Sequence, residues 1–328
     1  MYKHSMLIIF LLAQAIICKD VLAQSCCSGG VPLSGNIGMP ISEQGTWQFS
    51  LNYDLNVLNT LKDGSNTLSD NTRKRTTHSV MGQVGYTFNN RFSVESFFSF
   101  VRQERKITPK YQPTTFTATN GIGDALLLFK YRFIKNYQIG IGIKAPVGSS
   151  DLSNKRGLTL TADLQPGSGA WDIVYWIGGS QVMKFRKSMT AIGSVIYRVT
   201  GNNNAYFGNQ IYKFGNEIQA NLGIADRFTI GTVVFDPSIS IKYRQVNADR
   251  TKADNITGIK DVPSTGGEWI FIRPGMSYNM SPSTSLQANI ELPIYANLVN
   301  TQVTPTFRIN VGVNFILKNK NSYELNEI

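Results

Sequence analysis

The feature that most constrains this chain is a strict alternation of apolar and polar residues. In residues 45–57, apolar side chains from Trp47 to Val57 occupy every odd position, and polar side chains occupy the even positions between them. Successive side chains of a β-strand point to opposite faces, so a period of two predicts strands with one apolar and one polar face. A helical bundle is excluded because its pattern repeats every 3.6 residues.

The alternation predicts twelve strands, most of them about 12 to 15 residues long, where about 9–11 would cross the hydrocarbon of a membrane. In residues 227–245 the apolar positions change from even to odd, which predicts a bulge at Asp236–Pro237. The expected strands are 45–57, 77–88, 91–102, 125–133, 137–145, 170–183, 188–200, 211–224, 227–245, 268–280, 284–296 and 303–317.

The connections between these segments alternate in length. Short turns are expected at 89–90, 135–136, 184–187, 225–226 and 281–282, and long polar loops at 58–74, 106–121, 149–169, 201–210 and 247–267. Short periplasmic turns and long extracellular loops are typical of outer-membrane barrels. We therefore predict an all-β fold, a transmembrane antiparallel up-and-down β-barrel of about 12 strands. A soluble β-sandwich is the alternative, but it does not predict alternating loop lengths.

Composition agrees with an exported barrel. Charged residues make up 16% of the chain, against about 25% in soluble domains, while aromatic residues reach 11%. This balance excludes disorder, and a mean hydropathy of −0.13 excludes a helical membrane protein. Aromatic residues near the expected strand ends, such as Tyr86 and Phe92, suit the interfacial girdles of a barrel.

The N-terminus predicts a signal peptide over residues 1–23. A basic start precedes an apolar run from Met6 to Cys18, which is too short to span a bilayer, and Val21-Leu22-Ala23 suits cleavage before Gln24. A buried helix is the alternative. We expect the mature protein in the cell outer membrane, with lipidation of Cys26 left open.

Three segments, of which one is the barrel domain, should follow the signal peptide. Residues 24–44 have no strand period and are expected to be irregular, either as a plug in the lumen or as a periplasmic segment. Residues 45–317 should form the barrel, and residues 318–328 a polar C-terminal tail.

Several stretches resemble one family of Gram-negative outer-membrane proteins, named for the meta-pathway of phenol degradation and described as transporters. The similar stretches are Gly121-Ile122-Gly123-Asp124 leading to Lys130-Tyr131, Gly140 to Gly148, Gln165 to Gly169 followed by Trp171-Asp172, and Pro274 to Gln302. The resemblance covers roughly residues 120–175 and 265–317. It implies an outer-membrane barrel that transports small solutes.

No motif indicates an enzyme. Gly121 and Gly123 lack the third glycine and the helix of a dinucleotide loop. His78 and Ser79 are neighbours, so on a strand they point to opposite faces and cannot act as a catalytic pair. With His4 the only other histidine, we expect no catalytic residues, no metal and no cofactor.

The polar faces of the strands carry an excess of basic residues. We expect the pore lining to include Lys130, Arg132, Lys144, Arg198, Lys242, Arg244, Arg273 and Arg308, with Asp124, Asp172, Glu217 and Glu291. Counting Lys213, Asp54 and Glu95 as well, nine basic residues face six acidic ones. Two interpretations stay open: a mild anion preference, or opposite charges that pair and fill the lumen. Likewise, Asp124, Asp172 and Lys144 could form a polar cluster at the pore mouth or simply anchor loops.

Function follows from the expected fold. Twelve strands lie between side-chain-filled barrels of eight and water-filled barrels of sixteen. We therefore predict a passive channel for small organic solutes, aromatic or acidic, through a narrow, mildly basic lumen. The alternative is a non-conducting structural or surface-interaction barrel whose loops carry the function. The expected partners are the lipid bilayer, lipopolysaccharide and a small solute, and not nucleic acid, because the basic residues are spread over many strands.

Overall fold

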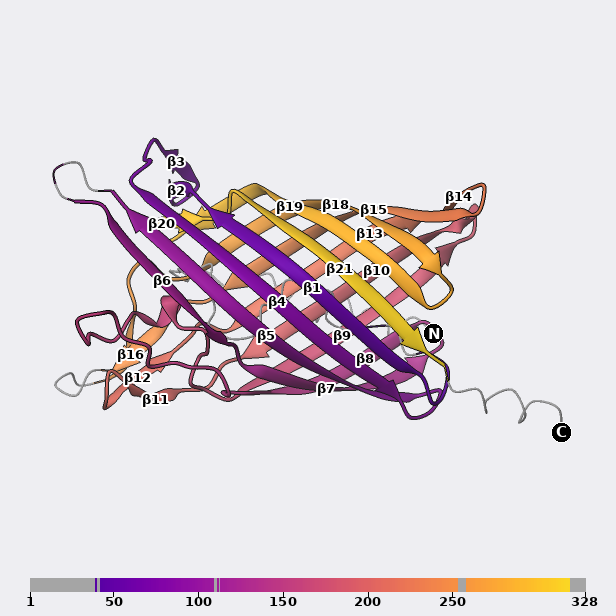
Figure 1. Cartoon of the computed structure of the whole chain (residues 1–328), viewed down its shortest axis with the longest axis horizontal. Coiled ribbons are helices and arrows are strands. Elements are labelled where there is room, and N and C mark those ends of the chain that lie inside the picture. The colour runs from indigo at the N-terminus through magenta and orange to yellow at the C-terminus, as the bar shows by residue number, and fades with distance from the viewer. Residues whose placement is uncertain (1–38, 40–41, 109–110, 112, 253–257, 319–328) are drawn as a thin grey trace, which may run out of the picture.

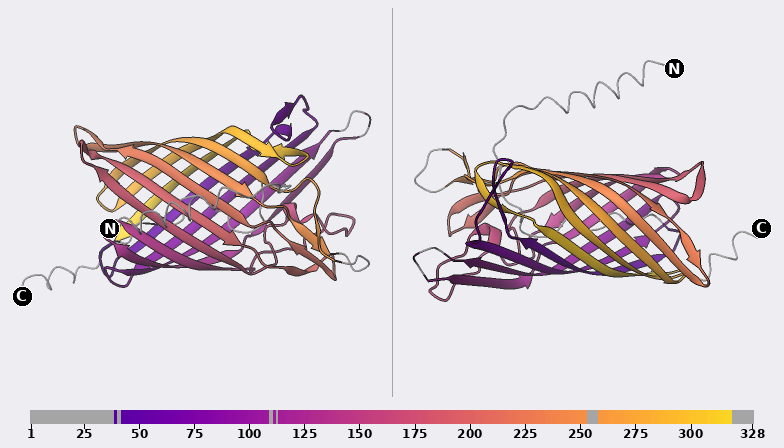
Figure 2. Two further views of the ribbon diagram at one scale, coloured as in Figure 1. Left: turned by 180° about the vertical axis from the view of Figure 1, so that it is seen from behind. Right: turned by 90° about the horizontal axis from the view of Figure 1, so that it is seen from above.

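The computed structural model describes residues 39, 42–108, 111, 113–252 and 258–318, and it is a closed antiparallel barrel of twelve strands. Its axis lies along the long dimension of the molecule, and the strands cross it at a steep tilt (Figures 1 and 2). The barrel strands are β1 (Trp47–Leu58), β4 (Arg73–Thr87), β5 (Phe92–Ile107), β7 (Ala125–Ile134), β8 (Tyr137–Ala145), β9 (Asp172–Met183), β10 (Arg186–Val199), β13 (Glu217–Asp226), β15 (Val233–Val246), β18 (Gly267–Ser281), β19 (Thr284–Leu298) and β21 (Phe307–Leu317).

The ring closes between the first and last strands. β1 pairs with β21 from Trp47↔Leu317 to Val57↔Phe307, and every other barrel strand also has two partners. Closure pairs the backbone groups of every strand, which is the condition for crossing lipid without helices. The predicted fold class is confirmed.

The alternation sorts side chains between the lipid face and the interior. On β7, Phe129 is 50% exposed on the outside, whereas Lys130 beside it is 2% exposed inside. The exterior is a continuous apolar surface, which water would disfavour and hydrocarbon accepts. A barrel with this exterior spans a membrane, and closed antiparallel barrels of this kind are found in outer membranes, as predicted. Separately, no helix in the described part of the chain is long and apolar enough to cross a membrane.

The long-loop end contains more strand structure than the sequence predicts. Shorter strands there are β2 (Thr60–Asp63), β3 (Asn66–Leu68), β6 (Thr115–Ile122), β11 (Asn203–Tyr206), β12 (Gln210–Lys213), β16 (Arg250–Lys252), β17 (Lys260–Asp261) and β20 (Thr301–Thr304). The only helix among the described residues is the short 3₁₀ turn η1 (Ala162–Leu164). The expected strands 211–224 and 303–317 are therefore wrong at their starts, because each is split between a loop strand and a barrel strand.

The predicted bulge at Asp236–Pro237 is also wrong. The chain reverses at Gly231, which has a positive φ of 61°, and β14 (Phe228–Ile230) pairs back onto the start of β15. Pairing of β15 with β18 then runs without a shift through Pro237. The change of parity in the sequence thus marks a turn, and the short turn expected at 225–226 lies several residues later. Pro237 falls in the gap between the part of β15 that pairs with β14 and the part that pairs with β13, a position where a strand tolerates proline.

Several predictions fall on residues outside the description. The signal peptide 1–23, the lipidation of Cys26 and nearly all of the tail 318–328 belong to this group. Of the segment 24–44, the structure describes Met39 and residues 42–44, and the Met39 carbonyl accepts a hydrogen bond from Lys130 Nζ.

Candidate functional site: the barrel interior

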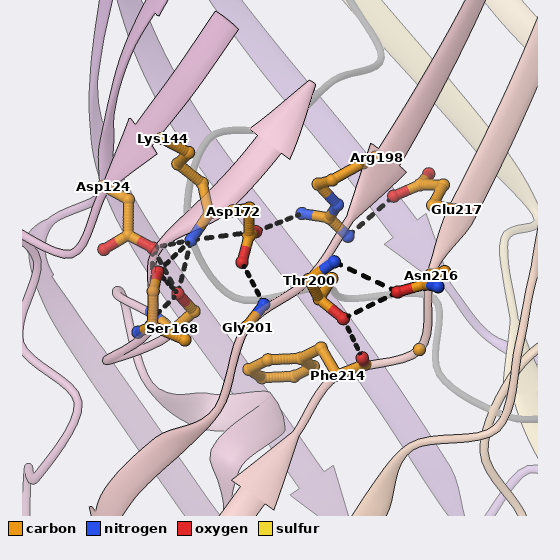
Figure 3. Close-up of polar contacts among 12 residues, drawn as sticks. Asp124, Lys144, Ser168, Asp172, Arg198, Thr200, Gly201, Phe214, Asn216 and Glu217 are labelled. Atoms are coloured by element: carbon orange, nitrogen blue, oxygen red, sulfur yellow. Dashed lines mark hydrogen bonds and ion pairs between the residues drawn. The ribbon is translucent and has the colours of Figure 1, made fainter. Parts of the chain in front are cut away.

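The interior of the long-loop half holds a cluster of paired charges (Figure 3). Lys144 Nζ lies 2.5 Å from Asp124 Oδ2 and 3.2 Å from Asp172 Oδ2. Arg198 then connects Asp172, at 3.9 Å, to Glu217, at 2.8 Å. All five side chains are at most 2% exposed. The cluster expected from Asp124, Asp172 and Lys144 exists, and it extends along the wall to β10 and β13.

The same carboxylates also hold the loops. Asp124 accepts hydrogen bonds from the backbone of Ser168 at 3.0 Å and of Gly148 at 3.3 Å, and Asp172 accepts one from Gly201 at 3.1 Å. The aspartates of the charge cluster therefore also anchor the loops.

Loop 149–169 folds into the mouth of the barrel instead of standing above it. Leu164 and Gln165 are buried, and the Leu164 carbonyl accepts a hydrogen bond from Thr119 Oγ1 at 2.6 Å. Asp163 lies 2.6 Å from Arg75 on β4. The loop thus narrows the extracellular entrance.

Two glycines of the family-like motifs make this inward path possible. A Cβ atom on Gly167 would lie 2.5 Å from the carbonyl carbon of Gly148, and one on Gly148 would lie 2.8 Å from Gly167 Cα. Gly167 N–H also donates to the Ser149 carbonyl at 2.8 Å. The backbones touch here, which only glycine permits.

A second group of charges lines the opposite wall. Glu291 lies 2.8 Å from Lys242 and 3.4 Å from Arg273, and Asp54 lies 2.8 Å from Arg308. Arg244 contacts Glu217 at 2.6 Å, which links this wall to the first cluster.

The remaining charges of the expected lining complete the picture. Lys130 pairs with Glu95, and both are buried. Arg132 is half-buried on the same face of β7. Lys213 does not belong with them, because it lies on the loop strand β12 and not in the barrel wall. The inner wall therefore carries eight of the basic residues counted from the sequence against six acidic ones.

Large apolar side chains share the interior with these charges, and sequence reasoning missed them. One group comprises Phe97, Leu126, Leu128, Val174, Trp176 and Ile196, and the other comprises Val246, Trp269, Phe271, Ala296 and Leu298. The available signal was a local break in alternation: runs such as Ala125–Phe129 and Tyr175-Trp176 are apolar on both faces. Cations stack on three of these rings, with Lys130 5.6 Å from the Trp176 centroid.

Toward the short turns the interior opens into a cavity of about 700 Å³. Small polar side chains such as Ser194, Ser240 and Asn221 line it, together with Trp176 and Arg273. Arg273 donates to Asn221 at 3.3 Å and to Asn289 at 3.4 Å. This volume lies within the 300–1,000 Å³ of small-molecule sites, and its walls combine an aromatic ring with a guanidinium.

The profile of the family described as "Putative MetA-pathway of phenol degradation" matches residues 98–297. The chain belongs to this family. The match confirms the resemblance seen in the glycine motifs and extends it upstream into β5. No curated protein matches the sequence significantly.

Among solved structures, the COG4313 outer membrane channel from Pseudomonas putida F1 has a TM-score of 0.60 at 14% identity, covering 88% of this chain and 100% of that one. The toluene transporter TodX from P. putida has a TM-score of 0.43 at 9% identity, covering 85% of this chain and 91% of that one. The first similarity shows a shared barrel fold.

The residues considered for a catalytic pair lie apart. His78 faces outward on β4, where its Nδ1 is 2.7 Å from the Tyr53 hydroxyl oxygen, whereas Ser79 is buried on the inner face.

Proposed function

We propose that this protein is a passive outer-membrane channel for small organic solutes of aromatic or acidic character. The observation that carries the proposal is the cavity of about 700 Å³ inside the wall, lined by Trp176 and Arg273 among small polar groups. A ring face suits aromatic solutes, and a guanidinium suits carboxylates or phenolates. The family description, which refers to phenol degradation, supports the same solute class, and the outer membrane channel among the similar structures supports a channel.

The charges of the lumen favour a weak selectivity for solute charge over a strong one. Most basic groups of the inner wall have a carboxylate partner, so the mean field along the path is small. The excess of eight basic over six acidic groups, to which Arg75, Arg105 and Asp163 near the mouth add one further positive charge, leaves a net positive interior, and such an interior attracts anions. We therefore propose a mild preference for anionic solutes.

A steric block tests the route. Ser194→Trp places a large ring in the cavity, whereas Val195→Trp places the same ring on the neighbouring, lipid-facing position. Two measurements are made: single-channel openings in planar bilayers and benzoate uptake into proteoliposomes. Ser194→Trp should abolish both the openings and the uptake, and Val195→Trp should leave both unchanged. Equal conductance in the wild type and Ser194→Trp would exclude this cavity as the path.

A non-conducting barrel whose loops carry the function is the second candidate. The inward packing of Leu164 and Gln165 at the mouth favours it. A barrel that is correctly folded, shown by heat-modifiable migration, yet silent at all voltages and closed to benzoate, would decide for this candidate.

A further inference from the structure

We propose that the outer face of β4, β5 and β6, just beyond the lipid-facing apolar band, is a binding site for the phosphate groups of a lipopolysaccharide molecule. Lys74, Arg102 and Lys106 form this site, which we call the outer basic patch. It is independent of the channel proposed above, because it lies on the opposite side of the wall. Figure 1 shows the three strands side by side toward the long-loop end.

The outward orientation of the patch follows from the pairing register. His78 is opposite Leu55 of β1, which belongs to the lipid-facing row, and Arg102 is opposite His78. Four residues further along each strand, Lys74 and Lys106 are opposite each other on the same face. Lys74, Arg102 and Lys106 are all exposed.

The patch begins where the apolar band ends. Phe98 and Phe100 precede Arg102 on the outward face of β5, and they are 54% and 47% exposed. Ile122 lies opposite Phe100 on β6 and is also exposed. A ligand at this height therefore meets hydrocarbon-compatible side chains on one side and cations on the other, and an anionic lipid has that combination.

The direct opposition of Lys74 and Lys106 is the observation that favours a bound anion. Like charges facing each other across an antiparallel pair are destabilising. No described residue forms an ion pair with either lysine, and the nearest acid on this face, Glu104, lies 2.7 Å from Arg102.

The inner face of the same hairpin shows how such an opposition is stabilised. Arg75 and Arg105 are opposite each other one residue away from the lysine pair. There Asp163 of the inward loop lies 2.6 Å from Arg75 and also interacts electrostatically with Arg105. The protein supplies a carboxylate to the inner pair, whereas the outer pair faces the leaflet, where lipid phosphates are the available anions.

The other wall at the same end differs. On β18 the outward residue is Glu268, which accepts hydrogen bonds from Tyr243 and Tyr295, each at 3.3 Å. The three cations of β4 and β5 thus have no counterpart at Glu268 on β18, which favours a specific lipid position over a uniform ring of contacts.

The test is binding of bisphosphorylated lipid A to the full-length mature protein in zwitterionic detergent with EDTA, measured by native mass spectrometry. The wild type should retain the lipid, and the triple variant Lys74→Gln, Arg102→Gln, Lys106→Gln should bind it roughly 10- to 100-fold more weakly. The matched control replaces three exposed lysines at the short turns, Lys135→Gln, Lys184→Gln and Lys187→Gln, and should bind like the wild type.

Two further arms separate the sources of phosphate. Dephosphorylated lipid A should bind to the wild type and to the triple variant with the same low affinity. Inorganic phosphate at millimolar concentration should not compete with bisphosphorylated lipid A for the wild type. Equal retention by the wild type, the triple variant and the control would overturn the proposal, as would competition by inorganic phosphate.

A second measurement does not depend on lipid affinity. Removing the lysine opposition with Lys74→Gln and Lys106→Gln should raise the thermal unfolding midpoint in lipid-free detergent and cancel the stabilisation that lipid A gives the wild type. A double variant that is still stabilised by lipid A as much as the wild type would contradict the site.

Discussion

The two halves of the barrel interior are built in opposite ways. Toward the long loops, Lys144, Asp124 and Asp172 are buried, paired and covered by loop 149–169. Toward the short turns, side chains such as Ser194 and Ser240 leave a cavity of about 700 Å³. The same alternating strands pass through both halves, so the residues on the inner parity decide where the barrel is solid and where it is hollow.

The difference shows that lumen charge does not by itself make an aqueous pore. Ionised groups removed from water require partners, and at the long-loop end those partners fill the space between the walls. Small neutral polar groups at the other end require less, and they leave room. Selectivity and closure are therefore expected to depend on different residues.

The strongest test of the solid half removes its central cation. Lys144→Met leaves Asp124 and Asp172 without their shared partner, and breaking a buried pair typically costs about 3–5 kcal/mol of unfolding free energy. Denaturant unfolding in lipid measures the loss. The control Arg227→Gln breaks the exposed pair with Asp236 and should cost less than about 1 kcal/mol. Similar losses in the two variants would show that the cluster is not stabilising.

The second test displaces the loop without touching a charge. Gly167→Ala forces a Cβ atom to within 2.5 Å of the Gly148 backbone, so loop 149–169 must move outward. We expect a cost of about 1–3 kcal/mol, faster proteolysis within the loop and larger single-channel conductance. Gly82→Ala is the control, because nothing lies within 4 Å of its Cβ position. An unchanged conductance in Gly167→Ala would mean that the loop does not limit the path.

The sequence predicts the barrel wall better than it predicts the long-loop end. Alternation suffices for the twelve strands, because each pair of neighbouring side chains is divided between lipid and interior. Alternation does not suffice at the long-loop end of the barrel. There β12 and β20 alternate like barrel strands but pair with other loop segments. β12 also pairs with its neighbour β11, but the partners β16 and β2 lie far away in sequence, and no local pattern specifies them.

The candidate site shows the same division. Inward charges such as Lys144 and Glu217 could be placed from parity alone. Their pairing could not, because Arg198 and Glu217 are brought together by the register between β10 and β13. Trp176 and Trp269 were missed because an apolar residue on the inner parity looks like an irregularity until closure of the barrel shows what it faces.

A third test concerns the chain that precedes the barrel. The Met39 carbonyl accepts a hydrogen bond from Lys130 inside the wall, so Met39 reaches the interior. Deleting residues 24–41 should therefore increase conductance modestly, while the unfolding midpoint stays close to that of the full mature chain. Lys130→Gln should increase conductance in the same direction. If the deletion leaves conductance unchanged, the segment acts outside the lumen.

The smallest expected effect is a pH dependence of the extracellular loops. Burial raises the pKa of Asp249 from 3.8 to about 7, although Tyr212 donates to it at 2.6 Å and the Gly215 N–H at 2.7 Å. Asp163 acts in the same direction as burial, and Arg198 opposes it.

Because the folded protein binds this proton more tightly than the unfolded chain, Asp249 favours the folded loops most at acidic pH. That contribution should fall as the pH rises from about 4 to about 7. The unfolding midpoint should therefore decrease by a few degrees between pH 5 and pH 8, and Asp249→Asn should remove this part of the decrease. An identical pH profile in Asp249→Asn would show that the carboxyl stays ionised throughout. In that case the hydrogen bonds from Tyr212 and Gly215 would outweigh burial, and the solid half would tolerate a charge at its outer edge as well as at its centre.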